Sequence, residues 1–206
     1  MKKLFLASSF ADVSKYFVDF IGDNVQGKTV TFIPTASNLE EVNHYMQNDK
    51  LAFEELGVIV DELDIAIAPL SLIEQKITLN DYIFIGGGNT FYLLQKLKKS
   101  GADQIIIQQI QQGKPYIGTS AGSVIVAPNI DYIGLMDEKA KAPLLTDYTA
   151  LNMVDFYPLP HYGNLPFKET AEQTLNRYQH QLSLYPISNT QFIKVINNEV
   201  EIGGTA

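Results

Sequence analysis

The segment YIFIGGGNT, from Tyr82 to Thr90, carries the clearest indication of the fold class. Its first four residues are all apolar, which is typical of a strand buried on both faces of a parallel sheet. Three glycines follow, and apolar residues then recur at helical spacing over 90–99, with Asn89 or Thr90 as the expected N-cap. A buried strand that leads through a short loop into a helix is the repeating unit of an α/β protein.

The same order of strand and helix recurs along the chain. Continuous apolar runs predict strands over 3–7, 29–33 and 115–118, and helical spacing predicts helices over 13–21, 39–56 and 103–112. Asn38 is the expected N-cap of helix 39–56, and Gly57 is its expected stop. Beyond Ser123 the pattern predicts loops and short strands over 137–147, a strand over 155–159, a helix over 168–181 and a hairpin of strands 191–196 and 199–202.

This order predicts an α/β protein of three layers, a mostly parallel sheet with helices on both faces. The sequence has no internal repeat, low-complexity tract or linker, so we expect residues 1–206 to form a single α/β domain. In such a sheet, catalytic groups gather at the carboxyl ends of the strands. Polar side chains that follow a predicted strand are therefore the candidates for a site.

The composition excludes several classes of function. The absence of cysteine excludes disulfides, thiol catalysis and cysteine zinc sites. The net charge of −8 and the lack of a basic patch argue against a nucleic-acid partner. No apolar run is long enough for a membrane helix, and the first residues have no signal-peptide pattern, so we expect a cytoplasmic protein with no membrane partner. The sequence implies neither a metal nor an organic cofactor.

The segment GTSAGS, from Gly118 to Ser123, is the first candidate. Ser120 follows a predicted strand and precedes a short predicted helix, and the glycines on either side permit a tight turn that exposes its hydroxyl. The N–H of Ala121 can then point at a developing oxyanion. The alternative is an ordinary serine N-cap in a glycine-containing turn.

The glycine loop before Asn89 is the second candidate. It lacks the Lys-Ser/Thr ending of a P-loop and the G-x-G-x-x-G spacing of a dinucleotide fold. The alternatives are a phosphate-binding loop or a merely flexible one. A second oxyanion donor, the N–H of Gly88, fits this position better.

His161 is the third candidate. It follows the strand-like run 155–160, where a general base for Ser120 would be needed. His44 and His180 fall in predicted helices and are expected to be structural or solvated. A lone histidine after a strand is more often a packed or surface residue, but the three candidates occur together at strand ends, which favours a catalytic role for His161.

Together these features resemble the peptidase E, or S51, family of serine peptidases, which includes α-aspartyl dipeptidase. The matching motifs are IFIGGGNTFYLL at 83–94, IGTSAGS at 117–123 and LPHY at 159–162, with FIPTAS at 32–37 as weaker support. They occur in order and at similar spacing over most of the chain. The resemblance implies a class I glutamine-amidotransferase-like, flavodoxin-like α/β fold.

The resemblance also implies a function, the hydrolysis of short peptides through an acyl-enzyme. Ser120 matches the family's nucleophile and His161 its general base. The N–H groups of Gly88 and Ala121 match its oxyanion hole. Asn89 and Tyr162 lie within these motifs and are candidates for contact with the peptide, although Tyr162 is as readily explained as a packing residue.

One departure from the family concerns the group that orients the histidine. The position of the family's glutamate, counted back from the closing EIGG at 201–204, is occupied by Asn189. An amide oxygen can orient an imidazole but does not stabilise imidazolium as a carboxylate does. Either Asn189 takes this role in a slower enzyme, or another acid such as Asp137 replaces the glutamate.

A second departure concerns specificity. The family's run GETREQ contains an arginine that recognises the aspartate side chain of the substrate. Here the run is KETAEQ at 168–173, and Ala171 stands at the position of the arginine. Lys168 and Arg177 are the candidate replacements. Strict aspartyl specificity is therefore not expected.

Three hypotheses remain open on the sequence alone. The first is a serine peptidase of the S51 type. The second is a binding or regulatory protein that kept the amidotransferase-like fold with weak or no catalysis, to which Asn189 and Ala171 point. The third, an esterase or amidase of the α/β-hydrolase type, would share the Ser120 motif but not the GGGN loop. The oligomeric state is left open, a homodimer included.

Overall fold

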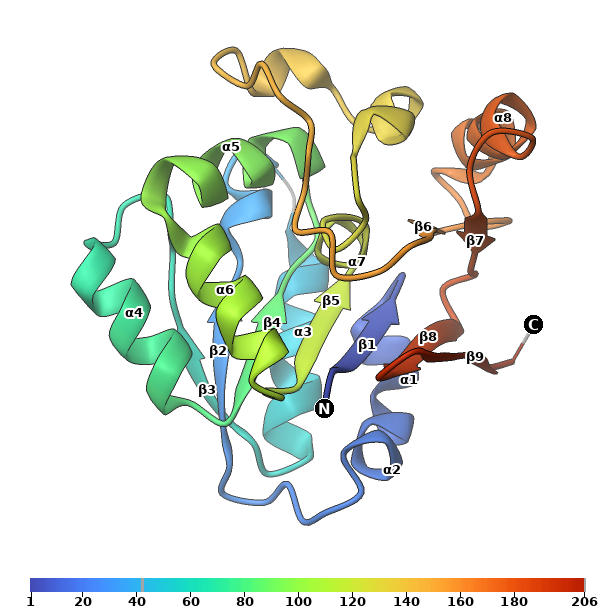
Figure 1. Cartoon of the computed structure of the whole chain (residues 1–206). Helices are drawn as coiled ribbons and strands as arrows, with labels where there is room; N and C mark the ends of the chain where they lie inside the picture. Colours follow the sequence, from blue (N-terminus) through green and yellow to red (C-terminus); the bar gives the residue numbers. More distant parts are fainter. Residues whose placement is uncertain (42, 206) are drawn as a thin grey trace.

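The computed structural model describes residues 1–41 and 43–205 (Figure 1). Its strands are β1 (Lys3–Ala7), β2 (Thr29–Ile33), β3 (Ile59–Glu62), β4 (Tyr82–Ile85), β5 (Tyr116–Thr119), β6 (Tyr157–Leu159), β7 (Leu184–Pro186), β8 (Gln191–Ile196) and β9 (Glu199–Gly204). Its α-helices are α1 (Phe10–Val13), α2 (Phe17–Ile21), α3 (His44–Glu55), α4 (Leu70–Leu79), α5 (Thr90–Ser100), α6 (Ala102–Gln111), α7 (Ala121–Val124) and α8 (Lys168–Tyr178). Short 3₁₀ turns are η1 (Ser14–Tyr16), η2 (Thr35–Ser37), η3 (Asp131–Leu135) and η4 (Lys139–Lys141).

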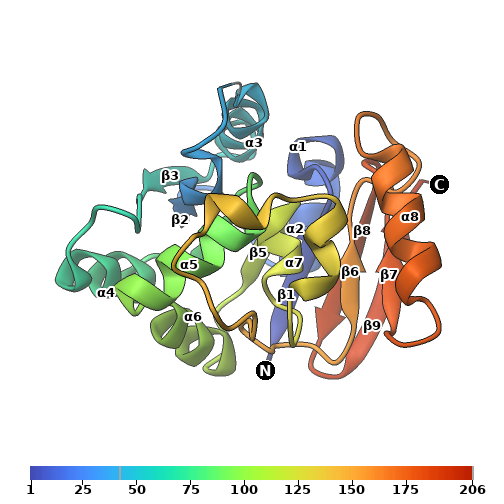
Figure 2. The ribbon, with the colours of Figure 1, turned by 90° about the horizontal axis from the view of Figure 1, so that it is seen from above.

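The large sheet has seven strands in the order β3-β2-β4-β5-β1-β8-β9. The first five are parallel to one another, whereas β8 is antiparallel to β1 and β9 to β8. The predicted mostly parallel sheet is thereby confirmed. The carboxyl ends of β1, β4 and β5 lie at the same end of the sheet. This end is at the top of Figure 1 and is seen from above in Figure 2.

The central strands contribute side chains to two separate cores. In β4, Ile83 and Ile85 pack with residues of α4, α5 and α6, whereas Tyr82 and Phe84 pack with aromatic residues of α1, α2 and α3. Figure 2 shows α5 and α6 on one side of the sheet and α1 and α3 on the other. The unbroken apolar pattern of β4 follows from this, because both faces of the strand are covered.

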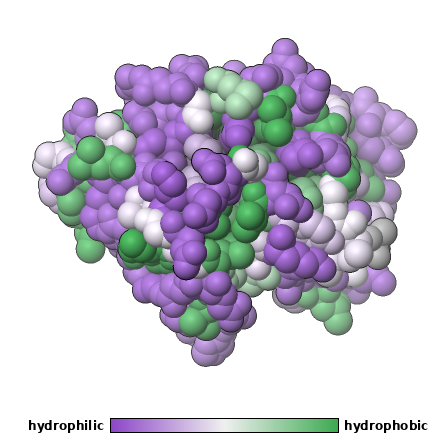
Figure 3. All heavy atoms as spheres, turned by 90° about the horizontal axis from the view of Figure 1, so that it is seen from below, coloured by the Kyte–Doolittle hydropathy of each residue, from purple (hydrophilic) through white to green (hydrophobic). Residues whose placement is uncertain are grey.

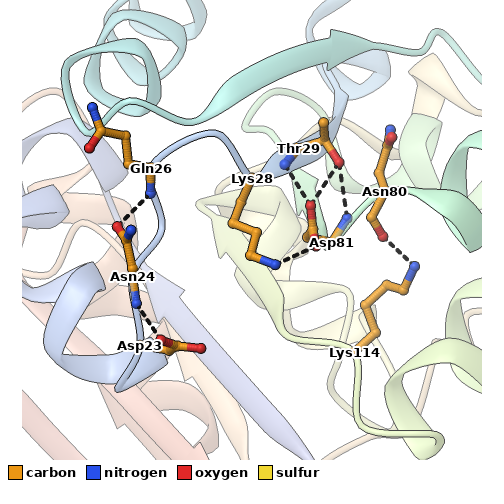
Figure 4. Close-up of polar contacts among 8 residues, drawn as sticks. All are labelled: Asp23, Asn24, Gln26, Lys28, Thr29, Asn80, Asp81 and Lys114. Carbon is orange, nitrogen blue, oxygen red and sulfur yellow. Dashed lines mark hydrogen bonds and ion pairs between the residues drawn. The ribbon is translucent and has the colours of Figure 1, made fainter.

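At the opposite end of the sheet, where the strands begin, polar contacts join neighbouring strands (Figure 4). Asp81, directly before β4, accepts hydrogen bonds from the N–H and the hydroxyl of Thr29 at 2.8 and 3.0 Å. Lys114 donates to the carbonyl of Asn80 at 2.5 Å. The face seen from this side is mainly hydrophilic, with hydrophobic residues in scattered groups (Figure 3). These contacts align the starts of strands whose far ends carry the candidate residues.

The helix predicted over 39–56 begins only at His44, so Asn38 is not its N-cap. The segment before it is instead bound to the loop after β3. Thr35 Oγ1 and Asn38 Nδ2 donate to the carboxylate of Asp64 at 2.8 and 2.9 Å. The prediction was wrong because a tertiary contact uses the side chain that local pattern assigns to a cap.

The helix predicted over 13–21 is divided into α1, η1 and α2. It begins earlier than predicted, at Phe10, because Asp49 of α3 accepts the N–H of Ala11 at 2.9 Å. The helix predicted over 168–181 ends at Tyr178, and the segment 137–147 contains η4 where short strands were expected.

The strand β3 and the helix α4 were not predicted from the sequence. The strand β3 lies at an edge of the sheet, and its residues are exposed or half-buried, so its apolar pattern is weak. In α4 only Ile73 and Ile77 are buried. Both elements are stabilised mainly by contact with their neighbours, β3 by pairing with β2 and α4 by packing beside α6.

Candidate active site

Ser120 stands at a sharp turn between β5 and α7. Its backbone has φ 51° and ψ −111°, a conformation that costs a non-glycine residue about 1–3 kcal/mol. The Ser120 N–H donates to the carbonyl of Ala7 at 2.9 Å. The buried hydroxyl of Ser123 donates to backbone carbonyls at the ends of β1 and β5, at 2.7 and 2.8 Å. These contacts hold the strained turn in place.

The glycines on either side of Ser120 serve close packing, because Ser120 itself carries the positive φ. A Cβ on Gly118 would lie 2.4 Å from the carbonyl oxygen of Gly122. A Cβ on Gly122 would lie 2.0 Å from the carbonyl oxygen of Ile85. The start of α7 therefore lies directly against β4 and β5.

His161 follows β6 and meets Ser120 from a distant part of the chain. Its Nε2 lies 2.9 Å from Ser120 Oγ, and its Nδ1 lies 2.8 Å from Asn189 Oδ1. An amide oxygen only accepts, so Nδ1 carries the ring proton and Nε2 is free to accept the proton of Ser120. The N–H of Asn189 donates to Asn164 Oδ1 at 2.9 Å. A hydroxyl, a neutral imidazole and an orienting amide thus form one hydrogen-bonded line.

The surroundings of His161 favour the neutral form of its ring. Burial lowers its pKa below the ordinary value of 6.5, and the hydrogen bond with Asn189 partly opposes this. Phe167, directly before α8, stacks on the imidazole with ring centroids 4.9 Å apart. The N–H of His161 donates to Ser8 Oγ at 3.0 Å. A neutral, fixed imidazole is the form that can accept a proton.

The glycine loop after β4 lies beside Ser120. A Cβ on Gly87 would be 3.1 Å from the Cβ of Ser120. Gly88 has φ 131°, and a Cβ there would be 2.2 Å from the carbonyl oxygen of Ala36, so only glycine fits. Within the described part of the chain, the N–H groups of Gly88 and Ala121 donate to no backbone carbonyl. Free donors beside a nucleophile are what an oxyanion requires.

Ser120, His161 and Asn189 line a cavity of about 400 Å³. This volume lies within the usual range for small-molecule pockets. The walls come from the ends of β1, β4 and β5, from α3 and the segment before it, from the segment of η3 and η4, and from the loop before α8. The wall residues include Glu40, Tyr45, Asp49, Asp137, Lys141 and Phe167.

The residues predicted to contact a peptide are distributed differently. Asn89 lines the cavity, but its Oδ1 accepts the N–H of Tyr92 at 2.9 Å and its Nδ2 donates to the carbonyl of Glu138 at 3.1 Å. Tyr162 packs against a hydrophobic core, and Lys168 is exposed at the start of α8. Neither of the last two is part of the cavity lining, so the structure does not bring them to Ser120.

The structure also shows where the residues of the two departures from the family pattern lie. Asp137 Oδ2 accepts the N–H of Thr90 at 2.8 Å, whereas Asn189 holds the imidazole, so Asp137 does not replace the orienting group. Ala171 is fully buried in a core, at 0% exposure. Arg177 is not part of the cavity lining. No replacement for the family's arginine comes from α8 within the described residues.

Three residues of the cavity lining, Phe167, Glu40 and Asp49, were not predicted from the sequence. Phe167 belongs to the apolar run Leu165-Pro166-Phe167 before α8, which was a usable signal for a contact near His161. Asp49 looks like a residue of a solvated helix face, yet it is only 3% exposed. His44 and His180 are exposed and lie outside the cavity lining.

Comparison with known proteins identifies the family of this chain. The model of Peptidase family S51 matches residues 4–203. An uncharacterized peptidase of Pasteurella multocida is 54% identical over 202 residues, covering 98% of this chain and 97% of its own. An uncharacterized peptidase of Listeria monocytogenes is 54% identical over 200 residues, covering 97% of each chain.

A crystal structure of a peptidase E candidate from Listeria monocytogenes superimposes with a TM-score of 0.95 at 52% identity, covering 100% of both chains. The α/β fold is thereby confirmed. The chain belongs to peptidase family S51 and is a serine-type peptidase.

Two further observations concern membrane-spanning helices and metal binding. Across residues 1–41 and 43–205, no helix has the length and apolar character that crossing a bilayer requires. Within the same ranges, no group of three or more His, Asp or Glu side chains is arranged to hold a metal ion.

Proposed function

We propose that the protein hydrolyses short peptides through an acyl-enzyme on Ser120. The observation that carries this proposal is the hydrogen bond of 2.9 Å between Ser120 Oγ and His161 Nε2 at the strained turn after β5. The N–H groups of Gly88 and Ala121, which donate to no backbone carbonyl among the described residues, and the cavity beside Ser120 support the same reaction. Membership of a serine peptidase family agrees with it.

The first half of the reaction forms the acyl-enzyme. Ser120 Oγ attacks the peptide carbonyl carbon while His161 Nε2 takes the hydroxyl proton. The N–H groups of Gly88 and Ala121 stabilise the oxyanion. The C–N bond then breaks as His161 gives its proton to the leaving amine. In the second half, water attacks the ester, His161 takes a proton from it and returns that proton to Ser120.

Asn189 is the positioning residue of this mechanism. Its oxygen holds the Nδ1–H tautomer of His161 but adds no negative charge beside the imidazolium that forms. The charge of that imidazolium is therefore stabilised less than it would be by a carboxylate. We expect a working but slower base than in a peptidase with an acidic third residue.

The test combines covalent labelling with turnover. A fluorophosphonate probe is expected to label the wild type at Ser120, and a panel of dipeptides is expected to be hydrolysed. Ser120→Ala should lose both properties while remaining folded. Ser14→Ala is the matched control, because Ser14 is a serine outside the cavity lining, and it should retain both. A folded wild type that is neither labelled nor active would favour the alternative, a binding protein with an inactive site.

A further inference from the structure

The cavity beside Ser120 is rich in acidic groups. Its lining includes four acidic residues and one lysine, with no arginine among the described residues. The acidic residues are Glu40, Asp49, Asp137 and Glu138, and the lysine is Lys141. A substrate that enters this cavity therefore meets a negative field.

The single lysine of the cavity is already paired. Lys141 Nζ lies 3.1 Å from Glu40 Oε1, and this hydrogen bond is the main reason that the pKa of Lys141 is raised. Asp137 and Glu138 act on Lys141 in the same direction. An aspartate side chain of a substrate would compete with Glu40 for this lysine. Among the described residues, the cavity consequently offers an incoming carboxylate only a lysine that already donates to Glu40.

Two of the carboxyl groups, those of Asp49 and Asp137, form no salt bridge among the described residues. Asp49 is 3% exposed, its Oδ1 accepts the N–H of Ala11 at 2.9 Å, and its Oδ2 has no hydrogen bond among the described residues. Asp137 accepts the N–H of Thr90. Burial raises the pKa of Asp49 to about 7 and that of Asp137 to about 6. A cation bound nearby would offset the cost of burying these charges.

Tyr45 lines the same cavity as these carboxyl groups and Ser120. Its pKa is raised to about 12 by burial and by the charges of Glu40, Asp137 and Asp49. Its ring would lie 3.5 Å from a Cβ on Gly87, which itself abuts Ser120. Tyr45 is therefore close both to the acidic groups and to the loop beside Ser120.

We propose that the cavity selects peptides that begin with lysine or arginine and rejects those that begin with aspartate, with Glu40 and Asp49 as specificity-determining residues. This inference rests on the proposed peptidase function. Such a peptide brings two positive charges, its terminal ammonium and its side chain, to a cavity whose carboxylates outnumber its one lysine. An aspartyl peptide brings a carboxylate that only the occupied Lys141 could bind.

The first test compares kcat/KM for Lys-X, Leu-X and Asp-X dipeptides with the same X. We expect Lys-X to exceed Leu-X, and Leu-X to exceed Asp-X, each by about tenfold, the ratio that corresponds to one modest ion pair. Glu40→Gln should release Lys141, lower the value for Lys-X and raise that for Asp-X. Asp49→Asn should lower the value for Lys-X without a gain for Asp-X.

Asp131→Asn is the matched control, because Asp131 pairs with Lys139 on the same segment but outside the cavity lining. It should leave the order of substrates unchanged. Asp-X as the best wild-type substrate, or Leu-X cleaved as well as Lys-X, would overturn the proposal while leaving the peptidase function intact.

A binding measurement separates the two proposals. Calorimetry on folded Ser120→Ala with Lys-X and Asp-X dipeptides reports selectivity without turnover. Tighter binding of Lys-X supports the specificity even if the wild type hydrolyses nothing. Equal binding, or tighter binding of Asp-X, refutes it. A wild type that shows neither probe labelling nor turnover would count against the peptidase mechanism alone.

Discussion

The ring of Phe167 lies on the imidazole of His161, with centroids 4.9 Å apart and planes inclined by 25°. An apolar ring in this place removes water from one face of the imidazole, and desolvation disfavours the imidazolium form. The same stacking restricts the rotation of the ring, whose two nitrogens are engaged by Ser120 and Asn189. Phe167 therefore influences both the pKa and the orientation of the proposed base.

The wild-type enzyme should stay active at mildly acidic pH. The base works only when neutral, and the pKa of His161 is lowered from 6.5. Activity is thus expected to be complete above this lowered pKa and to fall as pH drops through it. The measurement is kcat/KM against pH for a peptide whose own groups do not titrate in that range. An acid limb centred above pH 6.5 would contradict the assignment.

Replacing Phe167 by alanine should move the acid limb of kcat/KM to higher pH. Water would reach the imidazole, so the pKa of His161 would rise towards its ordinary value. We also expect kcat to fall about tenfold, because the ring would be less well oriented. Phe167→Leu keeps an apolar cover and serves as the control. An unchanged limb in Phe167→Ala would mean that other groups desolvate the base.

Asn189→Asp should restore a charged orienting group. A carboxylate at 2.8 Å from Nδ1 stabilises imidazolium, so the pKa of His161 should rise and the acid limb should shift to higher pH. On the alkaline plateau, kcat is expected to increase by about tenfold. Asn189→Leu, which removes the acceptor, should lose most activity. A pH–rate profile of both variants checks the prediction, and an Asn189→Leu enzyme with full activity would exclude Asn189 as a positioning residue.

Ser120→Gly should be more stable than Ser120→Ala. The backbone at this position has φ 51°, which glycine adopts without strain and alanine does not. The expected difference in the free energy of unfolding is about 1 kcal/mol, because the relief of strain is partly offset by the greater freedom of glycine in the unfolded chain. Urea unfolding of both inactive variants measures it. Equal stability would mean that the turn stores no strain.

Asp49→Asn should stabilise the protein at neutral and alkaline pH. The folded-state pKa of Asp49 is raised from 3.8 to about 7, so charging this group costs stability progressively as pH rises through that window. The asparagine oxygen can still accept the Ala11 N–H. The gain above pH 7 is about 4 kcal/mol at most, and it should vanish below pH 4. Denaturant unfolding at several pH values is the measurement, and a gain that is the same at all pH values would contradict this origin.

The sequence by itself predicted the central strands and the place of the candidate residues. The apolar runs of β4 and β5 are unbroken because both faces of each strand are buried, and such a pattern is visible without coordinates. Ser120 and Gly88 follow these strands directly, so their position at the carboxyl edge depends only on local order. Their catalytic roles, like that of His161, stay predictions.

The starts of α1 and α3 were not predictable from local pattern. Asn38 has the chemistry of an N-cap, but its amide donates to Asp64, which is 26 residues further along the chain. The start of α1 depends on Asp49 of another helix. Contacts between distant residues override local preference, because a buried polar group must find whichever partner the packing brings to it.

The chemistry of the cavity was likewise decided by tertiary structure. The sequence left Asn189 and Asp137 as alternatives, and only the packing of the loop after β7 against His161 places the amide at Nδ1. It also left Lys168 and Arg177 as substitutes for the family's arginine, whereas the structure presents Lys141 already paired with Glu40. Local sequence predicts strands and turns because burial and backbone preference act over a few residues. The charge and shape of the cavity depend on which side chains, distant from one another in the sequence, line it together.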